Sequence, residues 1–169
     1  IIPNEVVREQ IFSYLLDAYS DNDLTYDDYD IRKKEQLMAY CGDFKPFFQY
    51  IADSIYTFAS QRDRQKGESF VHGFTLALTS MCRFYRPISE LDNQNGYADI
   101  FLRPRQEIYD DMEHSYIVEL KYLNSKATDA QVASTIEQAK AQVCRYADTV
   151  NAKEQIGTTT LHKVYVVYR

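Results

Sequence analysis

The sequence lacks several features that would each indicate a particular class of protein. Its 169 residues contain no apolar run of about 18 residues, so no segment is predicted to span a membrane. The chain has three cysteines, Cys41, Cys82 and Cys144, too far apart in sequence to suggest a disulfide framework or a zinc site. Reduced, buried thiols in a cytoplasmic protein are the simpler interpretation.

An excess of positive charge is also missing. The net charge of −6 argues against broad, nonspecific binding of nucleic acid, but it is compatible with a local basic groove. The chain begins Ile-Ile-Pro, without a Met and without the charged and apolar segments of a signal peptide. We therefore expect a fragment of a longer protein. The strongly apolar stretch 164–168, next to the last residue, favours the same interpretation.

Hydrophobic residues make up 45% of the chain, enough for a substantial core, and their spacing predicts two regions. Helices predicted at 2–19, 31–40 and 44–60 form an N-terminal helical lobe over residues 1–62. The polar stretch 61–67 is the best candidate boundary. The second region, 68–169, is predicted to contain six elements in the order α-β-β-β-α-β: 68–81, 84–88, 97–102, 116–123, 128–150 and 164–168.

The connections between these elements predict an α/β fold. Strands 97–102 and 116–123 are joined by the charged loop 103–113, which favours an antiparallel hairpin. The long helix before strand 164–168 requires a crossover, so that strand is predicted to pair in parallel. The result is a mixed four-stranded sheet flanked by helices on both faces. Because strand 164–168 is apolar on both of its faces, we expect it to be buried between layers.

Local signals predict where several elements begin and end. Gly42 is a suitable C-cap for helix 31–40, and Thr128-x-x-Gln131 fits a capping box at the start of helix 128–150. The acidic stretch 20–30 is predicted to be a loop, and the polar stretch 90–95 is predicted to be a turn.

Two predicted strands carry charges where a buried strand normally has none. Asp99 lies in one, and Glu119 and Lys121 lie in the other. Because strand side chains alternate, Glu119 and Lys121 project to the same face, and their burial is costly unless they are paired or bound to a metal. If the two strands are neighbours, Asp99 meets Glu119 near one edge. Two carboxylates and one ammonium group at one point suit a divalent cation and a phosphodiester.

A polar stripe on helix 68–81 could extend this site. Glu68, His72, Thr75 and Thr79 recur at helical spacing on a helix that is otherwise apolar. A solvated helix face is one interpretation, and the other is that Glu68 and His72 lean into the site.

These residues resemble a known family. Asp99, about twenty residues of hairpin and Glu119-Leu120-Lys121 resemble the D…(D/E)-x-K signature of the PD-(D/E)XK nuclease superfamily, whose restriction-endonuclease-like core has the α-β-β-β-α-β order. The chain also resembles one branch of the superfamily, found at the C-terminus of bacterial AAA-ATPase-like proteins. The motifs that carry this narrower resemblance are Ile2-Pro3-Asn4, Glu68-x-x-x-His72-Gly73-Phe74, Gly96-x-x-Asp99-Ile100 and Tyr116-Ile117-Val118-Glu119-Leu120-Lys121.

The resemblance implies a role for each matching residue. Asp99 and Glu119 would bind a catalytic Mg²⁺ or Mn²⁺, and Glu68 matches a helix acid that often completes the metal shell. Lys121 would orient or activate the attacking water and stabilise charge on the phosphate. A further feature pairs a glutamine with a tyrosine on the following helix: Gln138 or Gln142, with Tyr146. Ala98 departs from the family name, which has proline there, but that proline is not a ligand.

Three functional hypotheses follow. The first is a metal-dependent nuclease acting on DNA or RNA, as the C-terminal part of a larger ATPase-like protein. The second is a catalytically silent, nuclease-like binding or regulatory domain of such an ATPase. The third is a structural salt bridge in an ordinary α/β domain. The chain has no Gly-x-x-x-x-Gly-Lys-Ser/Thr loop, so any ATPase activity would belong to another region of the parent chain.

Overall fold

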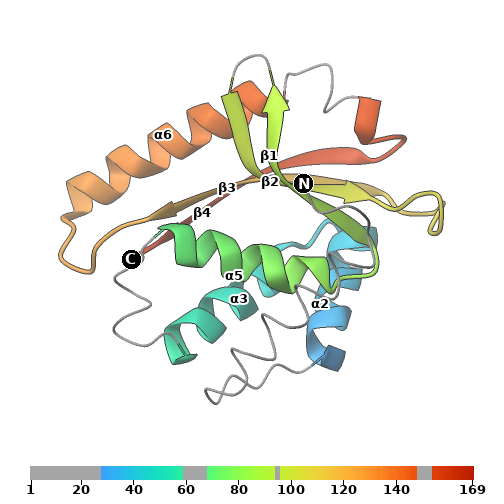
Figure 1. The fold of residues 1–169 in the computed structure, drawn as a ribbon, viewed down its shortest axis with the longest axis horizontal. Helices are drawn as coiled ribbons and strands as arrows, with labels where there is room; N and C mark the ends of the chain where they lie inside the picture. The colour runs from blue at the N-terminus through green and yellow to red at the C-terminus, as the bar shows by residue number, and fades with distance from the viewer. Residues whose placement is uncertain (1–27, 59–67, 94–95, 148–153) are drawn as a thin grey trace.

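A four-stranded sheet in the order β1-β2-β3-β4 separates the helices into two layers (Figure 1). The computed structural model describes residues 28–58, 68–93, 96–147 and 154–169. The predicted helix 2–19, the Ile2-Pro3-Asn4 motif and the boundary 61–67 lie outside the described residues. The described helices and strands are α2 (Asp28–Cys41), α3 (Lys45–Phe58), α5 (Glu68–Ser80), β1 (Tyr85–Asn93), β2 (Gly96–Pro104), β3 (His114–Tyr122), α6 (Asp129–Ala147) and β4 (Thr160–Tyr168).

The strand pairing confirms the predicted mixed sheet. Strands β1 and β2 form an antiparallel hairpin, and β2 pairs antiparallel with β3. Strand β4 pairs in parallel with β3, in register from His114↔Thr160 to Tyr122↔Tyr168, and α6 makes the crossover between them. The α-β-β-β-α-β order from α5 onward is therefore confirmed. None of the described helices is long and apolar enough to cross a membrane.

Two of the loop predictions were wrong in part. Strand β1 continues to Asn93, where the polar stretch 90–95 predicted a turn, because its backbone pairs with β2 as far as Asn93↔Gly96. Pairing of this kind needs no apolar side chains on an edge strand. Helix α2 begins at Asp28, inside the stretch 20–30 that was predicted to be a loop.

The two faces of the sheet carry separate apolar clusters. The smaller cluster lies under α6 and contains Phe101 and Ile117 of the central strands. The larger cluster contains the alternate strand residues, such as Ile100 and Val118, packed with α2, α3 and α5. Helices α2 and α3 thus share a continuous core with the sheet, and Figure 1 shows them on the same side as α5.

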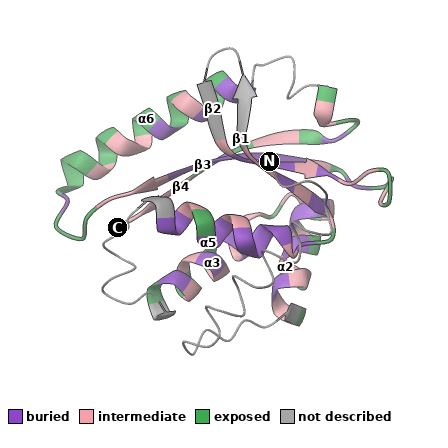
Figure 2. Ribbon diagram, in the orientation of Figure 1, coloured by how far each residue is buried: buried purple, intermediate pink, exposed green. Residues whose placement is uncertain are grey.

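Strand β4 is less buried than its sequence predicted. It forms an edge of the sheet, so its residues have strand neighbours on one side, those of β3. Val164 is buried, the residues that follow are half-buried or exposed, and Tyr165 is 37% exposed. The expectation that the strand is buried between layers was therefore wrong for most of its length (Figure 2).

The three cysteines are free thiols, but their predicted burial holds for Cys82 alone. Cys41 is exposed as the last residue of α2, and Cys144 is exposed on the outer side of α6.

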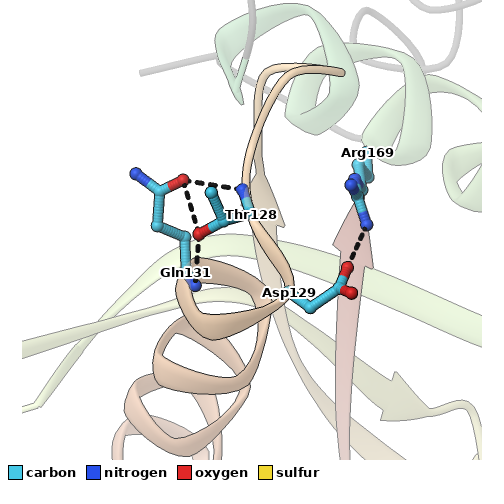
Figure 3. Close-up of polar contacts among 4 residues, drawn as sticks. All are labelled: Thr128, Asp129, Gln131 and Arg169. Atoms are coloured by element: carbon cyan, nitrogen blue, oxygen red, sulfur yellow. Dashed lines mark hydrogen bonds and ion pairs between the residues drawn. The ribbon is translucent and has the colours of Figure 1, made fainter.

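Both predicted helix-end signals are present. Gly42 follows α2 with a φ of +70°, in the left-handed region that glycine adopts without a steric penalty. At the start of α6, the Thr128 amide donates to Gln131 Oε1 (2.8 Å) and the Gln131 amide donates to Thr128 Oγ1 (3.3 Å), which is a reciprocal capping box (Figure 3). The Arg169 side chain contacts Asp129 at 3.0 Å, so the end of β4 is tied to the first turn of the same helix (Figure 3).

Candidate active site

The register of the central hairpin brings the predicted site residues together. Ile100 pairs with Val118, so the next opposed positions are Asp99 and Glu119. Alternation along each strand puts these two side chains and Lys121 on the face that also presents Phe101 and Ile117 to α6. All three charged residues therefore belong to the α6 face of the sheet.

The Asp99 carboxylate continues the hydrogen bonding between β2 and β3 beyond their last paired residues. The paired residues of β2 and β3 end at Ile100↔Val118. Beyond that pair, the Leu120 amide donates a hydrogen bond to Asp99 Oδ2 at 2.7 Å. Because Leu120 lies between Glu119 and Lys121, this bond places the Asp99 carboxylate beside the Glu-x-Lys triplet. Its second oxygen, Oδ1, takes no part in this bond.

Glu119 is a buried carboxylate with a close cation. Its side chain is 2% exposed, and its Oε1 lies 2.7 Å from Lys121 Nζ, whose side chain is 19% exposed. The desolvation of such a pair opposes its Coulomb attraction, so the pair is a poor source of stability. Together with Asp99, the three groups carry a formal charge of −1. The site is therefore suited to one additional cation.

Helix α6 adds a tyrosine to the same place. Burial, followed by the charge of Glu119, raises the pKa of the Tyr146 hydroxyl, and Asp99 adds to the rise while Arg145 and Lys121 oppose it. The hydroxyl thus lies within electrostatic range of all three strand residues. The hydroxyl is a neutral hydrogen-bond donor at physiological pH, and the raised pKa moves its ionisation still further from that pH.

The sequence left open whether Gln138 or Gln142 is the partner of Tyr146, and the two glutamines differ in their burial. Gln142 is partly buried and precedes Tyr146 by four residues, so the two lie on one stripe of α6 with the buried Ala139. Gln138 is exposed. The arrangement favours Gln142 as the partner of Tyr146 in the feature that the resemblance implies.

His72 supports the site from the opposite face of the sheet. Its Nε2 lies 3.0 Å from the backbone oxygen of Asp99 and 3.3 Å from Ser89 Oγ. A carbonyl oxygen can only accept, so Nε2 carries the hydrogen and the ring donates to the backbone of Asp99. His72 therefore positions the β2 backbone and does not offer this nitrogen to a metal.

The polar stripe on α5 is not a solvated face in its described part. Thr75 and Thr79 are 0% and 1% exposed, and Thr79 Oγ1 donates to the backbone oxygen of Thr75. Glu68 is the first residue of α5, one turn before His72, and its side chain lies outside what the structure describes.

The donor set fits a hard divalent cation. Asp99 and Glu119 supply carboxylate oxygens, the ligand type that Mg²⁺ and Mn²⁺ prefer. Within the described part of the chain, no three His, Cys, Asp or Glu side chains gather as a ready-made metal site. The resemblance names Glu68 as the further carboxylate.

One neighbour of the site was missed from the sequence. In the parallel register, Tyr165 of β4 lies beside Glu119, and Lys140 of α6 lies 5.8 Å from its ring centre. The long helix before β4 predicted its parallel pairing, but neither the helix nor the apolar pattern of the strand predicted its register. The sequence therefore held no signal that would have placed Tyr165 next to Glu119.

Comparison with known proteins identifies the family of this arrangement. A family model described as the PD-(D/E)XK nuclease superfamily matches residues 66–169, more than half of the chain. This range runs from just before α5 to the end of β4 and includes every candidate site residue. No curated protein gave a significant match. No solved structure gave one either.

Proposed function

Because the chain belongs to the PD-(D/E)XK nuclease superfamily, we propose that it hydrolyses phosphodiester bonds in DNA or RNA with the help of a divalent metal ion. The observation that carries this proposal is the hydrogen bond from the Leu120 amide to Asp99. It holds one carboxylate against the triplet that contains the buried Glu119 and its partner Lys121.

Each residue then has a distinct task. Asp99 and Glu119 hold the metal, Mg²⁺ or Mn²⁺, and Glu68 completes the carboxylate set. When bound, the metal supplies Lewis-acid chemistry, which polarises the phosphoryl oxygen and lowers the pKa of a bound water. Lys121 keeps its ammonium group beside the carboxylates, where it orients the attacking water and stabilises negative charge on the phosphate.

Helix α6 contributes donors rather than ligands. The Tyr146 hydroxyl is neutral at physiological pH, so it can donate to a phosphate oxygen. Gln142 lies one turn earlier on the same stripe and can donate through its amide. These two side chains would position the scissile phosphate over the carboxylates.

A catalytically silent, nuclease-like binding domain is the alternative. Two observations favour it: the net charge of −6, and the 2.7 Å contact that already engages Lys121 with Glu119. A domain of this kind would keep the fold and recognise nucleic acid or another protein without cleaving it.

The parent protein is part of the proposal. The branch motifs resemble the C-terminal part of bacterial AAA-ATPase-like proteins, which would place the chain in the cytoplasm beside its own ATPase region. The test is to read the coding sequence upstream of Ile1. A Gly-x-x-x-x-Gly-Lys-Ser/Thr loop after a predicted strand supports this parentage, and an upstream region without one overturns it.

The catalytic proposal is tested by metal binding and cleavage in the same variants. Calorimetry with Mg²⁺ compares the wild type with Asp99→Asn, which keeps an oxygen to accept from the Leu120 amide. The matched control is Asp110→Asn, a change at an exposed acid of the β2–β3 connection. Single- and double-stranded DNA and RNA serve as substrates.

The outcomes separate the two hypotheses. Saturable Mg²⁺ binding and cleavage that Asp99→Asn abolishes and Asp110→Asn preserves support the nuclease. Metal binding without cleavage of any polymer favours the silent domain. Absence of Mg²⁺ and Mn²⁺ binding, with and without nucleic acid, overturns the metal site.

A further inference from the structure

A cavity lies on the face of the sheet opposite α6, away from the carboxylates. It is a cavity of about 440 Å³ between α2, the segment that joins α5 to β1, and the β2–β3 connection. Its size is within the range of small-molecule sites, about 300 to 1,000 Å³. The residues on which the argument rests are Arg32, Lys33, Glu35, Arg83, Phe84 and Tyr109.

The cavity is distant from Asp99 and Glu119. Phe84 precedes Tyr85, which pairs with Pro104 at the end of β2. Asp99 is five residues away along β2, which corresponds to about 17 Å at the usual rise per strand residue. Glu35, moreover, is on α2, which packs on the sheet face opposite α6.

Positive charge gathers here in a chain that is acidic as a whole. The described residues that line the cavity include three cations, Arg32, Lys33 and Arg83, and one carboxyl group, that of Glu35. Both oxygens of that carboxyl group are taken up by backbone amides: Oε1 accepts from Phe84 (2.8 Å) and Oε2 accepts from Arg83 (3.2 Å). Burial raises the pKa of Glu35 to about 7, so at neutral pH this carboxyl group is only partly ionised.

Aromatic rings form the wall beside these cations. The rings of Phe84 and Tyr109 have centres 4.7 Å apart at 44°, and Tyr40 meets Phe84 edge-to-face at 5.6 Å. Glu35 accepts hydrogen bonds from the backbone amides of Arg83 and Phe84, so the backbone positions that carry one cation and one ring are fixed next to each other. A backbone held in this way does not have to be ordered when a ligand binds, which lowers the entropic cost of binding.

We propose that this cavity binds a nucleotide, with the phosphate on Arg83 and Lys33 and the base against the Phe84 and Tyr109 rings. Arginine matches phosphate oxygens with a planar fork of donors, and aromatic rings stack on any base. The same chemistry is offered by a free mononucleotide and by one unit of a single strand. This site goes beyond the proposed function, because it needs neither the metal nor the carboxylates.

The test is calorimetry on the whole 169-residue chain in EDTA, so that no metal occupies the carboxylates and no strand is cleaved. The probes are adenosine 5′-monophosphate, adenosine, inorganic phosphate and a single-stranded dT hexamer. The variants are Arg83→Gln and Lys33→Gln, both at exposed positions, so the fold is expected to persist, and circular dichroism checks this. Lys126→Gln, an exposed lysine outside the cavity, is the matched control.

We expect each cavity variant to weaken nucleotide binding about tenfold, the effect of one lost hydrogen bond to a charged group, and Lys126→Gln to leave it unchanged. Binding of the monophosphate identifies a free nucleotide as the ligand, and binding of the hexamer alone identifies a strand. Inorganic phosphate binding as tightly as the nucleotide overturns the role of the rings. No saturable binding of any probe overturns the proposal.

Asp99→Asn keeps this test independent of the nuclease. It removes one of the proposed metal-binding carboxylates, on the opposite face of the sheet, and is expected to bind nucleotide like the wild type. If Asp99→Asn loses nucleotide binding while Arg83→Gln keeps it, the nucleotide sits at the carboxylates, and the cavity proposal is wrong while the active-site proposal stands.

Discussion

Glu35 gives the sharpest prediction, because the carboxyl group of a fully buried side chain links pH to stability. Its side chain is 1% exposed, and it ties α2 to the amides of Arg83 and Phe84. Burial is the largest cause of its raised pKa, about 7 instead of 4.5, and the hydrogen bonds from Phe84 and Arg83 hold the rise in check. The folded protein therefore binds this proton more tightly than the unfolded chain does.

The sign of the effect follows from linkage. A raised folded-state pKa gives a stabilisation that is complete below pH 4.5 and is lost as the pH rises through about 7. The difference between 4.5 and about 7 corresponds to about 3 kcal/mol, and most of it falls between pH 5 and pH 8. Glu35→Gln cannot titrate, so its free energy of unfolding should lack this decline.

The assay is urea unfolding of the wild type and of Glu35→Gln at pH 5, 6, 7 and 8, followed by circular dichroism. The glutamine weakens one hydrogen bond at every pH, so only the change of the difference with pH is interpreted. The other titratable groups are present in both proteins, so their contributions cancel in the difference. Glu107→Gln changes an exposed residue, so its free energy of unfolding should change with pH as that of the wild type does. If the free energy of unfolding of Glu35→Gln also falls with pH as that of the wild type does, the reasoning is refuted.

Three further predictions use other parts of the fold. Burial, and next the charge of His114, lowers the pKa of His162 below 6.5, so stability that is present above pH 6.5 is lost as the pH falls through the folded-state pKa. In melting curves from pH 5 to 7, His162→Gln should show a smaller fall of the melting temperature with pH. A melting temperature that falls as steeply as in the wild type would contradict this prediction. Thr128→Ala removes the acceptor for the Gln131 amide and should cost about 1 kcal/mol in urea unfolding, whereas Thr128→Ser should cost less; equal losses would exclude the cap as the cause. The double variant Glu119→Leu with Lys121→Met should unfold at the same urea concentration as the wild type or a higher one, and it should bind no Mg²⁺. A fall of several kcal/mol in its free energy of unfolding would show that the pair is structural.

Much of the fold was predictable because its signals are local. The capping box and the glycine C-cap depend on residues within one turn of the helix end, and both are present as predicted. The parallel pairing of β4 followed from the length of α6, since a crossover is the only short route between parallel neighbours. The end of β1 and the exposure of β4 depend on which strands lie at the sheet edges, and the apolar pattern of a strand does not encode this.

Part of the candidate site was likewise predictable from local signals, and part depended on how the elements pack. Alternation along β3 put Glu119 and Lys121 on one face from the sequence alone, and the hairpin register brought Asp99 opposite them. The bond from His72 to the backbone of Asp99 joins residues 27 positions apart, on a helix and a strand whose packing had to be known first. The exposure of Gln138 likewise depends on how α6 is rotated against the sheet, which its polar residues alone did not decide.

The free energy of burying Glu119 and Lys121 bears on why these two charges are present in the site. Replacing a buried ion pair by apolar side chains of similar size is often neutral or stabilising by about 1 to 4 kcal/mol, so Glu119 and Lys121 are not explained by stability. Removing one partner alone leaves a buried charge and costs about 3 to 5 kcal/mol. Loss of activity in a single Lys121 variant would therefore combine unfolding with chemistry. The paired substitution, which removes both charges together, separates the two effects, and metal binding by Asp99 variants of unchanged stability then reports on the chemistry alone.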